Sequence, residues 1–235
     1  RRSLLKQLDQ VRRQIDRNQA TDSFDRYQKI ANALITSSEV HQALDISQES
    51  MAMRENYGMH LFGQSCLAAR RLVEAGSQFV TVFWDEFAYL NTDWDTHWNH
   101  YYRLKDRLLP PTDQGVSALL EDLEQSGRLD DTLVMMLGEF GRTPKINNKA
   151  GRDHWGPCFF ALFAGAGVQG GQVIGKTDAQ ATYPTTHPYS PEDIGATVYH
   201  LLGIPPDSVV HDRFNRPLQL NQGSIIEPLF TKQAT

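Results

Sequence analysis

Between Thr132 and Trp155, an apolar run is followed directly by a loop rich in charged residues. The run, Leu133–Leu137, is apolar at every position, which is typical of a strand buried on both faces in a parallel sheet covered by helices. The glycine-punctuated loop that follows carries a glutamate, two arginines, an aspartate and a histidine: Glu139, Arg142, Arg152, Asp153 and His154. Ligands of open α/β sheets bind at the carboxyl ends of strands, so this pattern indicates a metal or anion site. Each residue taken singly also fits a salt-bridged loop.

A second apolar run, Gln78–Trp84, comes before a long amphipathic pattern at Leu104–Ser126 that leads back into the first run. Strand, helix and strand in this order predict a right-handed βαβ unit whose two strands end at the same edge of the sheet. A third buried strand is expected within Pro157–Ala164. The loop after Trp84 should therefore meet Glu139 and His154, and it carries Asp93, Asp95, His97 and His100.

Helical spacing of apolar residues recurs elsewhere in the chain. We expect further helices at Leu4–Ile15, Ser23–Ile35, Met51–Tyr57, His60–Ala75 and Pro191–Leu202. These elements predict one α/β domain with an α/β/α layered, mostly parallel sheet. Residues 1–76 would be mainly helical, residues 77–204 would form the sheet core, and the proline-punctuated residues 205–235 would wrap the surface.

Composition narrows the classes of partner. The chain has 235 residues, 40% of them hydrophobic, with a net charge of −5 and a pI near 5.9. No basic stripe stands out, which argues against a nucleic-acid binder, and no apolar run is long enough to span a bilayer. Two cysteines, Cys66 and Cys158, are too few for a disulfide framework.

The polar loop near residue 95 offers carboxylate and imidazole ligands within a short stretch. Asp95 and His97, or Asp93 and His97, suit a divalent cation with mixed oxygen and nitrogen coordination, such as Zn, Mn or Fe, and His154 would supply a third ligand. The alternative is that aromatic residues pack this loop onto the sheet while the histidines hydrogen-bond locally.

Arg142 and Arg152 are planar forks suited to bidentate contact with a tetrahedral anion, or else to pairing with Glu139 or Asp153. A nucleophile is not evident, because no base is visibly aimed at Thr96 or Thr143 and the chain has no G-x-S-x-G motif. Any chemistry would then be metal-assisted.

Several motifs resemble an uncharacterised bacterial family. They are F-G-Q-S-C-L-A-A-R-R-L-V-E-A-G (residues 62–76), W-D-T-H (94–97), G-E-F-G-R-T-P (138–144), G-R-D-H-W (151–155) and G-G-Q-V-I-G-K-T-D (170–178). The family is named only as domain of unknown function, family fifteen-hundred-and-one. Its members look like exported proteins with a twin-arginine signal, so the resemblance implies an exported or periplasmic location. The family is similar to the alkaline phosphatase and sulfatase superfamily.

That resemblance implies roles for individual residues. Asp95 (or Asp93) and His97 match the superfamily's first Asp and downstream His, Glu139 matches its second Asp, and His154 matches its late His. Asp153 is a further candidate metal ligand. Phe140 stands where the second His would be, which implies that a second metal site is degenerate or absent.

The resemblance also implies a metal-dependent hydrolase of phosphate or sulfate esters, with Arg142 and Arg152 holding the substrate's anionic group. The superfamily takes its nucleophile and first metal-binding Asp from N-terminal strands, and no stretch before Gln78 reads as a core strand. The chain therefore looks like the C-terminal half of a family member, and we expect it to be inactive alone. The alternative is an exported, non-catalytic binding or structural protein on a degenerate hydrolase scaffold.

Overall fold

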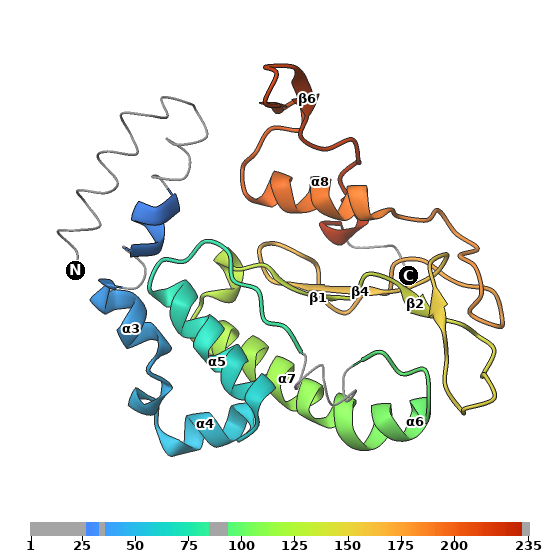
Figure 1. Cartoon of the computed structure of the whole chain (residues 1–235), viewed down its shortest axis with the longest axis horizontal. Helices are drawn as coiled ribbons and strands as arrows, with labels where there is room; N and C mark the ends of the chain where they lie inside the picture. Colours follow the sequence, from blue (N-terminus) through green and yellow to red (C-terminus); the bar gives the residue numbers. More distant parts are fainter. Residues whose placement is uncertain (1–26, 33–35, 85–93, 232–235) are drawn as a thin grey trace, which may run out of the picture.

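A computed structural model describes residues 27–32, 36–84 and 94–231 of the chain, and Figure 1 shows their arrangement. The helix predicted at residues 4–15 and the candidate ligand Asp93 lie outside the described residues. Of the helix predicted at residues 23–35, residues 27–32 are described and are helical.

The longer helices form where the spacing of apolar residues predicted them. The α-helices are α3 (Ser38–Leu44), α4 (Met51–Tyr57), α5 (Leu61–Glu74), α6 (His100–Arg103), α7 (Leu109–Gln125) and α8 (Pro191–Leu201). A π-helical segment, η3 (Leu104–Leu108), joins α6 to α7, and three 3-10 turns are η1 (Ile46–Gln48), η4 (Leu129–Asp131) and η5 (Glu227–Leu229). The helices predicted at residues 51–57, 60–75 and 191–202 are confirmed.

The hydrophobic core lies where α5 packs against α4 and α7. Its fully buried centre is formed by Tyr57, Cys66, Leu67 and Ala118. The Tyr57 hydroxyl donates a hydrogen bond of 2.8 Å to Asp122 on α7, which gives this buried polar atom its partner. These three helices form a rigid base from which η3 and α6 extend towards the candidate site.

The strands form three antiparallel pairs. The strand β1 (Val134–Leu137) pairs with β4 (Ala161–Ala164), in the register that sets Val134 opposite Ala164. The other pairs are β2 (Gly141–Arg142) with β3 (His154–Trp155), and β5 (Val209–His211) with β6 (Pro217–Gln219). The chain is therefore a mixed α and β protein, and the described residues contain no parallel strand pair.

The predicted βαβ unit is not observed. Residues 78–84 are extended but form no strand, because no neighbouring backbone in the described part of the chain pairs with them. β1 is only half-buried rather than buried on both faces. Its partner β4 is reached through the loop at 138–160, which reverses the chain direction, and not through a helical crossover.

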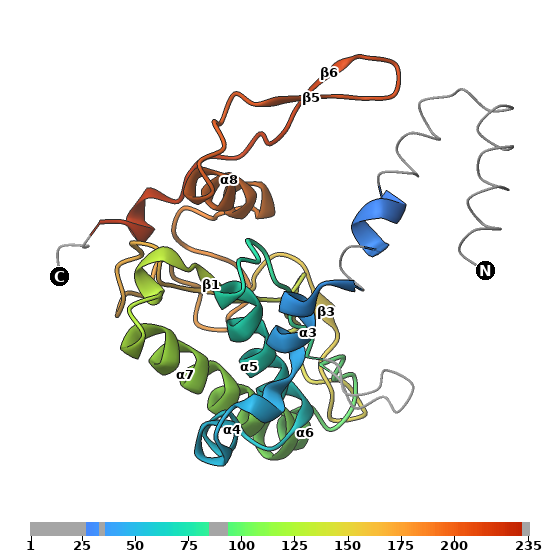
Figure 2. The ribbon, with the colours of Figure 1, turned by 90° about the vertical axis from the view of Figure 1, so that its left-hand side faces the viewer.

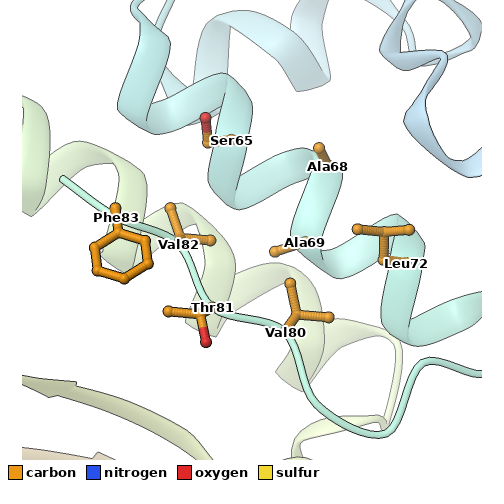
Figure 3. A pocket seen from close by; sticks show the side chains of 8 residues that line it. All are labelled: Ser65, Ala68, Ala69, Leu72, Val80, Thr81, Val82 and Phe83. Atoms are coloured by element: carbon orange, nitrogen blue, oxygen red, sulfur yellow. The ribbon is translucent and has the colours of Figure 1, made fainter. Parts of the chain in front are cut away.

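Helices nevertheless lie on both sides of the β1–β4 pair. Figure 1 places α5 and α7 on one side and α8 on the other, and Figure 2 shows the same order from a second direction. A hollow of about 200 Å³ lies between α5 and the extended segment, where Figure 3 shows Ala69 and Leu72 beside Val80 and Val82. Its lining is mainly apolar and bears no charged side chain.

The sequence predicts that the whole segment at 205–235 wraps the surface, but only part of the segment does so. Ile226 donates its backbone N–H to the buried Thr197 hydroxyl of α8 at 3.0 Å, and Ile226 and Leu229 are buried. The β5–β6 hairpin instead projects away from α8 (Figure 2), and all of its strand residues are exposed. None of the described helices has the length and apolar character to cross a membrane.

Candidate metal centre

Two loops that are distant in sequence are joined by backbone hydrogen bonds at the candidate site. Asn99 and His100 donate their N–H groups to Lys149 and Ala150 at 3.1 and 2.9 Å, and Arg152 donates to the carbonyl of Thr96 at 3.2 Å. Gly151 lies between these bonds and is buried against the peptide of His97. The loop at 94–99 is thereby fixed against the loop at 147–154.

The short β2–β3 pair completes this framework. Its register sets Arg142 directly opposite His154. The Thr143 N–H donates to the Asp153 carbonyl at 2.9 Å, and the Asp153 N–H donates to the Thr143 hydroxyl at 3.0 Å. The side chain of His154 is therefore held by a paired strand and not by a free loop.

Asp95, His97 and His154 converge within this framework. Asp95 Oδ1 lies 3.0 Å from His97 Nε2 and 2.8 Å from His154 Nε2, and the two Nε2 atoms are 3.1 Å apart. The described part of the chain contains one such group of three potential metal ligands, and it consists of these residues. The predicted meeting of Asp95, His97 and His154 is thus what the structure shows.

The cluster is open to solvent. The side chains of Asp95, His97 and His154 are 48%, 39% and 49% exposed. Partial burial acts to raise the pKa of Asp95, but hydrogen bonds from His154 and Arg142 outweigh it and lower this pKa to about 2. Asp95 is therefore ionised at neutral pH and is a competent ligand for a cation.

The two arginines point inward and hold the loops together. Arg142 donates from Nη2 to Asp95 Oδ1 and to the Trp94 carbonyl, both at 2.8 Å. Arg152 donates to the Thr143 carbonyl at 3.2 Å and to the hydroxyl of Tyr101. Both guanidinium groups are thus engaged by the protein, and their role in holding an anion stays a prediction.

Two other predicted ligands lie outside the cluster. Glu139 is exposed and is not one of the three residues whose ligand atoms converge. Its neighbour Phe140 instead packs its ring on His154, with the ring centroids 4.1 Å apart. Asp153 faces the far nitrogen of His97, with its Oδ1 atom 2.8 Å from Nδ1, and is also absent from the group.

His100, from the same polar loop, is a structural histidine. It is 7% exposed, and its Nδ1 lies 2.7 Å from the hydroxyl of the buried Thr96. Burial, together with the positive charges of Arg152, Arg142 and Arg103, lowers the pKa of this histidine. A buried imidazole held neutral in this way supports the loop and does not face the cluster.

Sequence reasoning missed Asn147. Its side-chain oxygen accepts the N–H groups of Lys149 and Gly151, both at 2.9 Å, and its amide donates to Asp153 and to the His97 carbonyl, both at 3.0 Å. An asparagine shortly before a glycine is a signal for this kind of side-chain-stabilised turn. The signal predicts the turn, but not the contact with the distant loop.

Fold and site together define a mixed α and β protein with an open cluster of two imidazoles and one carboxylate beside a short antiparallel strand pair. The chain belongs to the family described as protein of unknown function (DUF1501), whose profile matches residues 1–230. No curated protein and no solved structure gives a significant match to the chain.

Proposed function

We propose that Asp95, His97 and His154 bind one divalent cation, and that in the intact protein this cation serves the hydrolysis of phosphate or sulfate esters. The observation that carries the proposal is the convergence of the three ligand atoms, which come from two loops joined by backbone hydrogen bonds. The proposed site lies next to the ends of β2 and β3 and is open to a ligand.

The side chains suit a cation in both type and spacing. Imidazole nitrogens and a carboxylate oxygen are the mixed donor set that Zn, Mn and Fe accept. The donor atoms lie 2.8 to 3.1 Å apart. With bonds of about 2.1 Å, two ligands on one metal are about 3.0 Å apart at right angles and about 3.4 Å apart at the tetrahedral angle of zinc, so one small cation fits once the donor atoms move apart by a few tenths of an ångström around zinc.

A bound cation would supply Lewis-acid stabilisation of negative charge on an ester oxygen. The chain's own residues define its surroundings. Arg142 holds Asp95 in position through a charge-assisted hydrogen bond, and Phe140 covers one face of the His154 ring. The exposed side of the cluster leaves space for an anionic ester.

The described threonines near the cluster are poor candidates for the nucleophile. The hydroxyl of Thr96 is buried against His100, while that of Thr143 donates to the Lys145 carbonyl and accepts the Asp153 N–H. We propose that neither of these threonines is the nucleophile of the hydrolase.

We further propose that the intact protein has the layered, mostly parallel sheet of the alkaline phosphatase type and, from the resemblance of its motifs to a family of exported proteins, that it is exported. Helices on both sides of the β1–β4 pair support the layers. Phe79 and Phe83 on the extended segment are 73% and 83% exposed, and Phe160 before β4 is 71% exposed. Large apolar side chains in such positions are suited to burial by additional strands.

The proposal is tested by measuring metal content and ester hydrolysis. After dialysis against zinc or manganese and then against metal-free buffer, mass spectrometry should find one equivalent of metal in the wild-type chain. His154→Ala should lose it, while His211→Ala on the exposed β5 strand should retain it. Full-length protein should hydrolyse aryl phosphates or aryl sulfates only when loaded with metal.

Different outcomes separate the alternatives. Retention of the metal by His154→Ala would show that the ion binds elsewhere and would overturn the site. Metal binding without hydrolysis in the full-length protein would reject the hydrolase and favour the non-catalytic binding protein. A full-length protein that neither binds metal nor cleaves either ester would reject the whole proposal.

A further inference from the structure

We infer that Asp153 is a positioning residue that selects the ring tautomer and orientation of His97, and is not itself a ligand of the cation. This inference rests on the proposed cation site and deepens it. It also reassigns one residue that the sequence placed among the metal ligands.

The two ring nitrogens of His97 contact different groups. Nε2 lies among the converging atoms, 3.0 Å from Asp95 Oδ1 and 3.1 Å from His154 Nε2. Nδ1 lies 2.8 Å from Asp153 Oδ1. An ionised carboxylate only accepts hydrogen bonds, so Asp153 favours a proton on Nδ1 and Asp95 one on Nε2. Asp95 Oδ1 already has Arg142 and His154 at 2.8 Å, so the shorter contact with Asp153 favours the neutral imidazole whose proton sits on Nδ1. Nε2 is then left with the lone pair that a metal ligand needs.

Asp153 is itself held in place for this role. Asn147 Nδ2 donates to the same Oδ1 atom at 3.0 Å, and the backbone of Asp153 is bonded in both directions to Thr143. His97 Nδ1 and Asn147 Nδ2 thus both approach Oδ1 of Asp153 as hydrogen-bond donors, which suits an accepting carboxylate. A fixed carboxylate of this kind restricts the rotation of the His97 ring.

The same geometry excludes Asp153 from the residues that bind the cation directly. Its Oδ1 atom approaches the side of the imidazole that faces away from Asp95 and His154. One cation cannot be bound by His97 Nε2 and also by a carboxylate hydrogen-bonded at Nδ1 of the same ring. Carboxylates behind metal-binding histidines typically contribute about 10- to 100-fold to metal affinity without touching the metal.

His154 provides an internal comparison. Its Nε2 faces Asp95 Oδ1, and its ring is packed by Phe140, but within the described ranges no carboxylate is hydrogen-bonded to its Nδ1. Removing Asp153 should therefore act directly on the tautomer of His97, and on that of His154 only through the 3.1 Å contact between the two Nε2 atoms. A general loss of loop structure would affect both rings.

The first experiment uses metal-free protein. Long-range proton–nitrogen NMR of the imidazoles at about pH 8, where an ordinary histidine is neutral, reports which nitrogen carries the proton. Wild-type His97 should show the proton on Nδ1. Asp153→Ala should shift His97 towards the Nε2–H form that predominates in free histidine, and Asp153→Asn should fall between, because its amide oxygen accepts a hydrogen bond but carries no charge.

The second experiment measures zinc affinity by competition with a chromogenic chelator. Asp153→Ala should weaken binding by about 10- to 100-fold, Asp153→Asn should weaken it less, and the exposed-residue control Asp207→Ala should match the wild type. Thermal melting checks that every variant remains folded.

The two proposals fail in distinguishable ways. If wild-type protein binds zinc and Asp153→Ala binds it equally well, the positioning role is overturned while the cation site stands. If wild-type protein binds no zinc, the cation site falls. In either case, a proton found on Nε2 of wild-type His97 overturns the role assigned to Asp153.

Discussion

Gly151→Ala should break the junction between the two loops of the site. A Cβ atom at Gly151 would lie 1.9 Å from the His97 carbonyl oxygen, 2.0 Å from its carbon and 2.4 Å from the nitrogen of Trp98. All three are backbone atoms, which cannot rotate out of the way as a side chain could. The loops would have to separate by roughly 1 Å, because Cβ contacts under 3.0 Å essentially never occur.

That separation would weaken the cross-loop hydrogen bonds on either side of Gly151, which join Asn99 to Lys149 and Thr96 to Arg152. Overpacking costs about 1–3 kcal/mol, and each weakened hydrogen bond adds up to about 1 kcal/mol. We expect a loss of about 3 kcal/mol in the free energy of unfolding. For a chain of this size that loss lowers the melting temperature by about 6–12 °C.

The assay is thermal unfolding followed by circular dichroism, together with the zinc affinity of the folded variant. Gly156→Ala is the matched control, since a Cβ there meets nothing within 4 Å and the residue lies two positions after His154. Both the stability and the zinc affinity of Gly151→Ala should fall, and those of the control should not. A Gly151→Ala protein that melts and binds zinc like the wild type would refute the reasoning.

Three further predictions concern the scaffold. Arg70, which is 8% exposed, lies 3.0 Å from Asp122, whose side chain is 15% exposed. Arg70→Met should cost about 3 kcal/mol, because it leaves this largely enclosed carboxylate without its cation, and an unchanged urea midpoint would contradict this. Burial raises the pKa of Cys66 to about 12, whereas Cys158 is only partly buried, so iodoacetamide should alkylate Cys158 first in the native protein. Peptide mass spectrometry that finds Cys66 alkylated first would contradict the buried core. Ser190→Ala removes the capping box of α8 and should cost about 1 kcal/mol in denaturant unfolding, whereas an unchanged stability would show that the cap is dispensable.

The helices could be predicted from the sequence because their signals are local. His60–Ala75 has apolar residues at helical spacing and a glycine directly after it, and α5 occupies Leu61–Glu74. Ser190 and Asp193 form the capping box that begins α8. Each signal lies within a few residues of the feature that it predicts, so no knowledge of the tertiary structure is needed.

Strand pairing could not be predicted in the same way. Apolar runs report a tendency to be buried, but a strand exists only when another backbone completes its hydrogen bonds. The run at 78–84 has no such partner among the described residues, whereas the run at 133–137 pairs with residues 161–164 in the antiparallel direction. The direction depends on the path of the intervening loop, which apolar spacing does not encode.

Asp95 and His154 lie close together as the sequence predicted, but the physical reason differs from the one that we expected. We expected the two residues to meet because parallel strands end at one edge of a sheet. They meet instead through the β2–β3 pair and the backbone bonds between the loops. The roles of Arg142 and Asp153 were harder to predict, since the sequence shows what a side chain can donate or accept but not which partner it reaches.

The central claim is tested most directly by crystals of the chain grown with zinc and measured at the zinc absorption edge. We expect one anomalous peak in contact with Asp95, His97 Nε2 and His154 Nε2, with Asp153 hydrogen-bonded to His97 and away from the peak. A zinc-loaded crystal with no peak among these three side chains, or with its peak bound by other residues, would contradict it.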